Sequence, residues 1–374
     1  MARTEALPRV ERGSVEVLRL YDVAYAIDLA RVEEIGAMQS PTTVARIRLT
    51  RAKPKAIAFG TPPVEIALGP VRLPFADGER VAQASARIYD FGVVSIALRI
   101  AANGLSWEDY AARVRAAGEV AGTEAGSAVW TELVARVRNF IAPAIERPTP
   151  PGLEEDYILA VVNALEPALT AEELLERVDI AALLSGESQP LSASARRDLL
   201  RYSFSYFRND LAVVTWDSAF LLEPGGDTDV ADVLEVANAQ LLELRYYDEL
   251  LDSELPRMYD RVAQAHRALR GLSLRRYARL ARDLHTLVAD ITEVTEKVDN
   301  ALKVTEDVYL ARIYAAALEL FRVRAWSGDI DRKLGIIRDT YQTLYDEAAT
   351  ARAEILEATI VLLIVLEIVL AWVV

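Results

Sequence analysis

The chain of 374 residues has no cysteine and only two histidines. The lack of cysteine excludes disulfide bonds, thiolate catalysis and cysteine-ligated zinc or iron–sulfur sites. His266 and His285 lie nineteen residues apart, outside any pattern such as H-E-x-x-H, and no phosphate-binding glycine loop or serine elbow occurs. We therefore predict no catalytic residues, no metal site and no cofactor, and a protein that is not an enzyme.

The N-terminus lacks the apolar run of a secretory signal and the arginine-rich, acid-poor pattern of a transit peptide, so we expect synthesis and folding in the cytosol. The chain also has fewer basic residues than acidic ones. The formal net charge of -14 disfavours binding to a phosphate backbone, although a local basic stripe could still bind an anionic partner. Nucleic acid is thus disfavoured as a partner but stays an open alternative.

Residues 1–226 contain both strand patterns and helix patterns. Alternating or β-rich runs predict strands, and amphipathic runs after a Ser106 cap predict helices up to residue 146. A proline-rich linker is expected at 147–152. The expected fold class is α+β: an N-terminal α/β sandwich with ferredoxin-like elements, then a long α-helical coiled-coil hairpin and a C-terminal transmembrane helix. The strand-like runs are 15–27, 63–73, 80–100, 155–165 and 210–224.

A helical arm is predicted for 227–354, where the strand signals stop. Apolar residues recur there at alternating spacings of three and four, which is typical of a coiled-coil seam. A glycine stop and an aspartate cap at 326–329 predict the turn of an antiparallel hairpin. Apolar positions off the seam, such as Ile336 and Tyr345, predict a homo-oligomer; the alternative is that they pack on the N-terminal domain. The seam residues are Leu284, Leu287, Ile291, Val294 and Val298, then Leu334, Ile337, Tyr341 and Leu344.

The last twenty residues, 355–374, form a nearly unbroken apolar run. As a helix it would be about 30 Å long, which matches a bilayer core, so it predicts a C-terminal membrane anchor. The alternative is a helix buried in a core or in an oligomer. The anchor implies a lipid bilayer as a partner and a protein at the cytoplasmic membrane, with most of the chain in the cytoplasm. The residues that define this anchor are Ile355, Glu357, Ile364, Glu367 and Trp372.

Two charged runs stand in the arm. Acidic residues crowd 243–254, and an arginine run follows at 266–282. The arginines could pair with the acidic helix, contact anionic lipid headgroups, or bind RNA or a ribosomal surface through phosphates. Pairing with the acidic helix is favoured because the opposite charges are close in sequence. The arginines considered for contact with an anion or a partner are Arg270, Arg275, Arg276, Arg279 and Arg282.

Three segments resemble a known family. The ending Leu356-Glu357, Ile360, Leu363-Ile364, Glu367-Ile368 is similar to the L-E-W-x-I-x-x-L-I-x-x-E-I ending of the required for meiotic nuclear division (Rmd1/Sif2-like) family, with Ala358 in place of tryptophan. Residues 89–94 and 241–252 are similar to its F-x-[FY]-G-V-x-V strand and to the segment before its coiled coil. The family's S-x-A-L-A-Q-S-type helix has no counterpart here. The resemblance implies a bacterial member with an α+β head, a coiled-coil arm, an anchor and self-assembly; mitochondrial relatives support organelle translation.

Together these features predict a membrane-anchored, self-assembling scaffold that is not an enzyme, whose α+β head binds a protein partner not named by the sequence. Two alternatives stay open. One is a membrane factor that associates with RNA or the ribosome through the arginine run. The other is a hydrolase in the head that uses carboxylates and a metal ion, which would require three or more carboxylates in one pocket.

Overall fold

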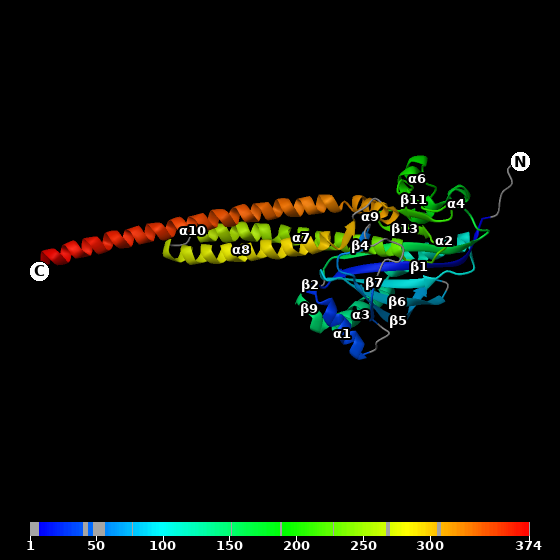
Figure 1. Cartoon of the computed structure of the whole chain (residues 1–374), viewed down its shortest axis with the longest axis horizontal. Helices are drawn as coiled ribbons and strands as arrows, with labels where there is room; N and C mark the ends of the chain where they lie inside the picture. The colour runs from blue at the N-terminus through cyan, green and yellow to red at the C-terminus, as the bar shows by residue number, and fades with distance from the viewer. Residues whose placement is uncertain are drawn as a thin grey trace. The chain divides into compact units, whose positions relative to one another are not determined.

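A computed structural model describes residues 7–39, 44–47, 57–76, 78–150, 152–187, 189–226, 228–266, 270–304 and 308–373. The chain divides into two compact units (Figure 1). The first unit contains Met1–Glu243 and Glu296–Arg324, and the second contains Leu244–Thr295 and Ala325–Val374. The boundaries therefore differ from the predicted head at 1–226 and arm at 227–354, because parts of the predicted arm belong to the first unit.

The first unit is built on a mixed β-sheet. Within the described residues ten strands join it, in the order β11-β12-β13-β10-β1-β7-β6-β5-β3, with β8 paired to β1. Neighbours are antiparallel except β10 and β13, which are parallel. The strands are β1 Arg9–Asp22, β3 Val44–Arg46, β5 Val64–Phe75, β6 Gly78–Ile88, β7 Val93–Ala101, β8 Leu105–Ser106, β10 Glu154–Glu166, β11 Ser203–Phe204, β12 Leu211–Val214 and β13 Ser218–Leu222.

Strand alternation gives the sheet two buried faces. Val15 and Val17 of β1 pack with Ala86 and Ile88 of β6 and with helices α2 (Trp107–Gly122) and α3 (Glu124–Ile141) in the main core. Residues of opposite parity, such as Leu18, are also buried, although they lie outside that core cluster. Because successive side chains on a strand point to opposite faces, the second face needs its own cover. The N-terminal part of helix α7 (Asp229–His266), which belongs to the first unit, supplies cover through contacts such as those of Asp232 and Glu235 with Arg87 of β6.

The turn between β6 and β7 depends on Gly92. Its φ is +99°, and an added Cβ would collide with the carbonyl of Ala24, so only glycine fits without strain. Asp90-Phe91-Gly92 thus forms a tight hairpin turn between two long antiparallel strands, both within the strand-like run predicted at 80–100.

The remaining elements of the first unit are short. Helices α1 (Leu29–Gln39), α4 (Ala171–Arg177), α5 (Ile180–Ser185) and α6 (Ala193–Leu199) connect the strands. Strand β2 (Ala24–Ile27) pairs with β9 (Ile145–Pro148), so part of the predicted proline-rich linker is a strand. Strand β4 (Ile57–Phe59) pairs with β14 (Leu302–Val304), and helix α9 is Tyr309–Leu320. The helical arm predicted for 227–354 is therefore interrupted just after the seam residue Val298, by β14.

The second unit is helical. It contains the rest of α7, most of α8 (Arg270–Asp299) and almost all of α10 (Val323–Val373). Pro256 lies inside α7 and does not end the helix. The turn before α10 falls at Phe321–Arg322, with Arg322 at a φ of 56°, and α10 continues through the predicted turn at 326–329. Gly328 is tolerated because a single glycine weakens a helix by only about 1 kcal/mol.

The α+β class is confirmed, but one part of the predicted architecture is wrong. Across the part of the chain that the structure describes, no helix has both the length and the apolar character needed to cross a membrane. The predicted transmembrane helix at 355–374 and the membrane localisation are therefore overturned. The segment is the end of α10, where Glu357 and Glu367 interrupt the apolar run, and a carboxylate inside hydrocarbon costs about 3 kcal/mol.

Candidate functional site

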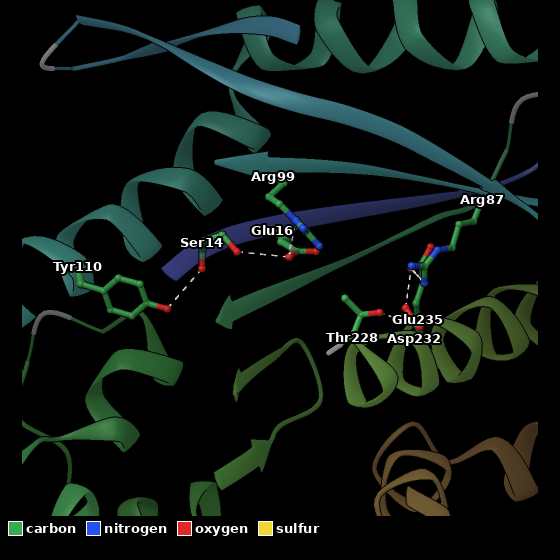
Figure 2. Close-up of polar contacts among 8 residues, drawn as sticks. All are labelled: Ser14, Glu16, Arg87, Arg99, Tyr110, Thr228, Asp232 and Glu235. Carbon is green, nitrogen blue, oxygen red and sulfur yellow. Dashed lines mark hydrogen bonds and ion pairs between the residues drawn. The ribbon is translucent and has the colours of Figure 1, made fainter. Parts of the chain in front are cut away.

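Charged side chains gather between the sheet and helix α7, on the face opposite α2 and α3 (Figure 2). Glu16 of β1 and Arg99 of β7 are register partners in the antiparallel ladder. Arg99 Nε lies 2.8 Å from Glu16 Oε1, and Ser14 Oγ donates to the same oxygen at 3.4 Å. Glu16 is buried whereas half of the Arg99 side chain is exposed, so this pair marks the edge of the cluster.

The centre of the site is Arg87 of β6, which binds two carboxylates of α7. Arg87 Nη2 lies 2.7 Å from Asp232 Oδ1, and Nη1 donates to Glu235 Oε2 at 2.6 Å. Residues three apart share one face of a helix, which is why both acids meet one guanidinium. The exposed fractions of the Asp232 and Glu235 side chains are only 3% and 5%. We call Arg87, Asp232 and Glu235 the ion cluster.

The start of α7 reinforces the cluster. Thr228 Oγ1 donates to Asp232 Oδ2 at 3.1 Å, and Asp232 N donates to the Thr228 carbonyl at 2.8 Å. Asp229 and Asp232 both stand in the first turn, where negative charge stabilises the helix dipole. Asp232 therefore has partners on its own helix and on the sheet.

Burial sets the protonation of the cluster. Burial raises the pKa of Glu235 to about 7, and the nearby charge of Arg87 only partly opposes this. The pKa of Asp232 is also raised by burial, against the effect of Arg87. Burial disfavours the Arg87 cation, but Glu235 and Asp232 outweigh it and raise the pKa of Arg87 well above its usual value. Two carboxylates thus share one buried cation, and Glu235 titrates close to neutral pH.

The adjoining space is small. A pocket of about 50 Å³ is lined by polar and apolar side chains that include Ser14, Glu16, Arg99, Asn163 and Thr228. Sites for small-molecule ligands usually measure about 300–1,000 Å³, so this pocket is too small for a substrate. Over the described ranges no three His, Asp or Glu side chains are grouped closely enough to hold a metal ion. The carboxylate-metal alternative gains no support from these residues.

The predicted seam residues occupy both units. Leu284, Ile291 and Val294 of α8 and Leu334, Ile337 and Leu344 of α10 are buried in the second unit, and Leu287 and Tyr341 are half-buried there. Val298 is buried in the first unit.

The residues predicted to form the anchor are all exposed in the single chain: Ile355 at 43%, Ile364 at 50% and Trp372 at 89%, with Glu357 and Glu367 also exposed.

Part of the acidic run binds a residue that was not among its predicted partners. Lys333 of α10, which the sequence reasoning did not single out, lies 2.7 Å from Asp248 and 2.5 Å from Asp252 of α7. Arg279 and Arg282 are exposed on α8, and Arg282 Nε donates to the Ala278 carbonyl. The side chains of Arg270, Arg275 and Arg276 lie outside the described residues.

Sequence reasoning also missed the ion cluster. A signal existed, because Gln83, Ser85 and Arg87 place polar residues on one face of a strand whose other face is apolar. A second signal is the spacing of Asp232 and Glu235 in the first part of α7, residues 229–244, which is otherwise almost fully buried. Their pairing joins residues 145 or more positions apart, and no local pattern predicts it.

These features define a class: an α+β protein with a large mixed sheet and a helical second unit. Its described residues contain no group of side chains that could hold a metal ion and, beside the ion cluster, no pocket large enough for a substrate. Residues 12–228 match the model of the family described as "Uncharacterized protein MJ0711, N-terminal domain", and the chain belongs to this family. It is 27% identical over 190 residues to uncharacterized protein MJ0711 of Methanocaldococcus jannaschii, an alignment that covers 50% of this chain and 57% of that relative. The chain thus spans just over half the length of this relative. No solved structure matches. These matches show no link to the Rmd1/Sif2-like family.

Proposed function

We propose that this protein is a self-assembling scaffold, not an enzyme, and that the end of α10 binds the same segment of a second copy. The observation that carries this proposal is the terminal segment, defined here as residues 355–372. Its large apolar side chains are at least 43% exposed in the single chain: Ile355, Leu356, Ile360, Val361, Leu362, Leu363, Ile364, Val365, Leu366, Ile368, Val369, Leu370 and Trp372. A helix that is apolar on all sides is normally buried, so this segment needs a partner.

The spacing of the seam supports a second copy as that partner. Leu334, Ile337 and Leu344 are buried against the second unit's other helices, and the same alternation continues through Leu362 and Val365. Figure 1 shows α10 lying beside α7 and α8 and then continuing beyond the end of α7 and the start of α8. The interface that buries the seam therefore ends while the seam continues, which leaves a matching surface for an identical helix.

The two carboxylates of the terminal segment fit this arrangement. At 100° per residue, Glu357 lies about 110° and Glu367 about 170° from the line midway between Leu362 and Val365. Both charges are thus off the seam and would stay exposed when two seams pack. Assembly through this segment would present several first units together to a partner protein. The resemblance of Leu356–Ile368 to the Rmd1/Sif2-like ending, which implies self-assembly, agrees with this proposal.

The test is the mass of the full chain in solution by sedimentation equilibrium. We expect wild type to form a multiple of the one-chain mass, and the variant Leu362→Glu/Val365→Glu to fall to one copy, since two buried carboxylates would be unpaired in the interface. The matched control is Thr350→Glu, an exposed position off the seam, which should leave the mass unchanged. A single copy of wild type at tens of micromolar, or recovery of single copies on lipid vesicles, would refute the proposal.

A further inference from the structure

The ion cluster has an uneven charge. Arg87 contributes one positive charge, while Asp232 and Glu235 contribute two negative charges when both are ionised. All three belong to the interface between β6 and the first turns of α7, in the first unit. A surplus buried charge destabilises such an interface unless a proton neutralises it.

The surroundings of Glu235 favour that proton. Glu235 Oε2 binds Arg87, whereas Glu235 Oε1 and Ser95 Oγ are buried without a hydrogen-bond partner among the described residues. The other groups that face Glu235 are Asp232 on α7 and, from the sheet, Glu65 of β5, Ser95 of β7 and Tyr89, which follows β6. Arg87 is the one cation among these neighbours. Ser95 Oγ can accept a hydrogen from a protonated Glu235 or donate one to an ionised Glu235, and a hydrogen bond from it lowers the pKa of Glu235; burial next to Asp232 and Glu65 is what favours the proton.

We propose that the ion cluster is a pH-sensitive clamp, which holds the start of α7 firmly on the sheet when one carboxylate is protonated and loosens it when both are ionised. The clamp is a regulatory device for α7, the helix whose two halves belong to different units. It is independent of assembly through α10.

The direction of the effect follows from linkage. The pKa of Glu235 rises from the ordinary 4.5 to about 7 in the folded protein. A carboxyl group with a raised pKa stabilises the folded state fully below pH 4.5, and that stabilisation falls as the pH rises to about 7 and stays lost above it. Docking of α7 is therefore tighter in acid and looser in alkali, opposite to the usual effect of a carboxylate in a simple salt bridge.

Hydrogen exchange of the full chain tests this clamp. After correction for the intrinsic exchange rate, we expect the protection of amides in residues 233–238 to fall roughly 30-fold between pH 5.5 and pH 8 in wild type. Glu235→Gln keeps the shape of the side chain but cannot ionise, so its protection should be independent of pH over this range. Asp232→Asn offers a second route, because Arg87 then faces a single carboxylate and the surplus charge disappears.

Asp22 supplies the matched control. Burial raises its pKa to about 7 as well, but its contact is Thr149. Asp22→Asn should therefore leave the pH dependence of α7 intact. The clamp is refuted if wild-type α7 shows constant protection from pH 5.5 to pH 8, if Glu235→Gln and Asp232→Asn both retain the wild-type fall, or if Asp22→Asn abolishes it.

Discussion

Lys333 shows how one side chain can hold two helices together. Its ammonium group is bound by Asp248 Oδ1 and Asp252 Oδ1, and it also donates to the Asp248 carbonyl at 3.2 Å. The exposed fraction of the Lys333 side chain is 10%, that of Asp248 is 14% and that of Asp252 is 61%. The two carboxylates are therefore unequal, and Asp248 depends more on the lysine.

We expect Lys333→Met to lower the free energy of unfolding by about 1–3 kcal/mol, less than the full loss of a buried ion pair because Asp252 stays solvated. Urea denaturation of the full chain measures this. The control is the neighbouring Arg332→Met, whose Asp329 pair is exposed on the same helix and should matter by less than about 0.5 kcal/mol. Equal effects of the two substitutions would contradict the role of Lys333.

Residue roles could be predicted only where partners are close in sequence. The acidic run was expected to pair with the adjacent arginines, but its Asp248 pairs with a lysine 85 positions away. Arg87 and its two acids are farther apart still. Charge patterning identifies which residues need a partner, whereas tertiary contacts decide which partner they find.

At the scale of elements, most of strand β5 lies at an open edge of the sheet, and its sequence blocks further strand pairing. Within the described residues β3 pairs with β5 only at Val64–Ile66, and the rest of β5 contains Pro70 and Pro74. Proline has no N–H, so neither residue can donate to a further strand, and Gly69 adds a bulge at a φ of 87°. Arg136 Nη1 also donates to the Leu68 carbonyl at 2.9 Å. These features protect the edge from pairing with another chain.

Restoring the missing donors should expose that edge. We expect Pro70→Val/Pro74→Val to aggregate several-fold faster than wild type on mild heating, followed by light scattering, because both side chains are exposed and a strand former replaces each proline. Pro224→Val, in the exposed turn before α7, is the matched control and should behave like wild type. An unchanged rate in the double variant would show that the prolines do not protect β5.

Element type was easier to predict than element ends. The strand-like run predicted at 80–100 corresponds to most of β6 and to β7, because a β-rich pattern is a local signal. The end of α9 was missed because Arg322, not glycine, adopts the positive φ there. Strand β14 was missed because three residues next to an apolar helical repeat carry no distinct period, and β4 stabilises them from far away in the sequence.

At the scale of the whole molecule, the buried core belongs largely to the first unit, and the described side chains of the terminal segment are all exposed. We therefore expect a chain that ends at Glu354 to keep the thermal unfolding midpoint of the full chain at low concentration, measured by circular dichroism. At high concentration the full chain should be more stable than the truncated one, because assembly stabilises by mass action. A lower midpoint for the truncated chain at low concentration would mean that the segment stabilises a single copy.

Each of the two units is made of segments that are not contiguous in the sequence. Residues 244–295, in α7 and α8, belong to the second unit, although the residues before and after them belong to the first. The segment Glu296–Arg324 adds β14 and α9 to the first unit. The pair of α7 and α8 is thus an insertion with both ends in one unit. Adding or removing the same number of whole turns from α7 and α8 between residues 244 and 295 would change the length of this helical pair while keeping both junctions, so that length can be adjusted separately from the sheet.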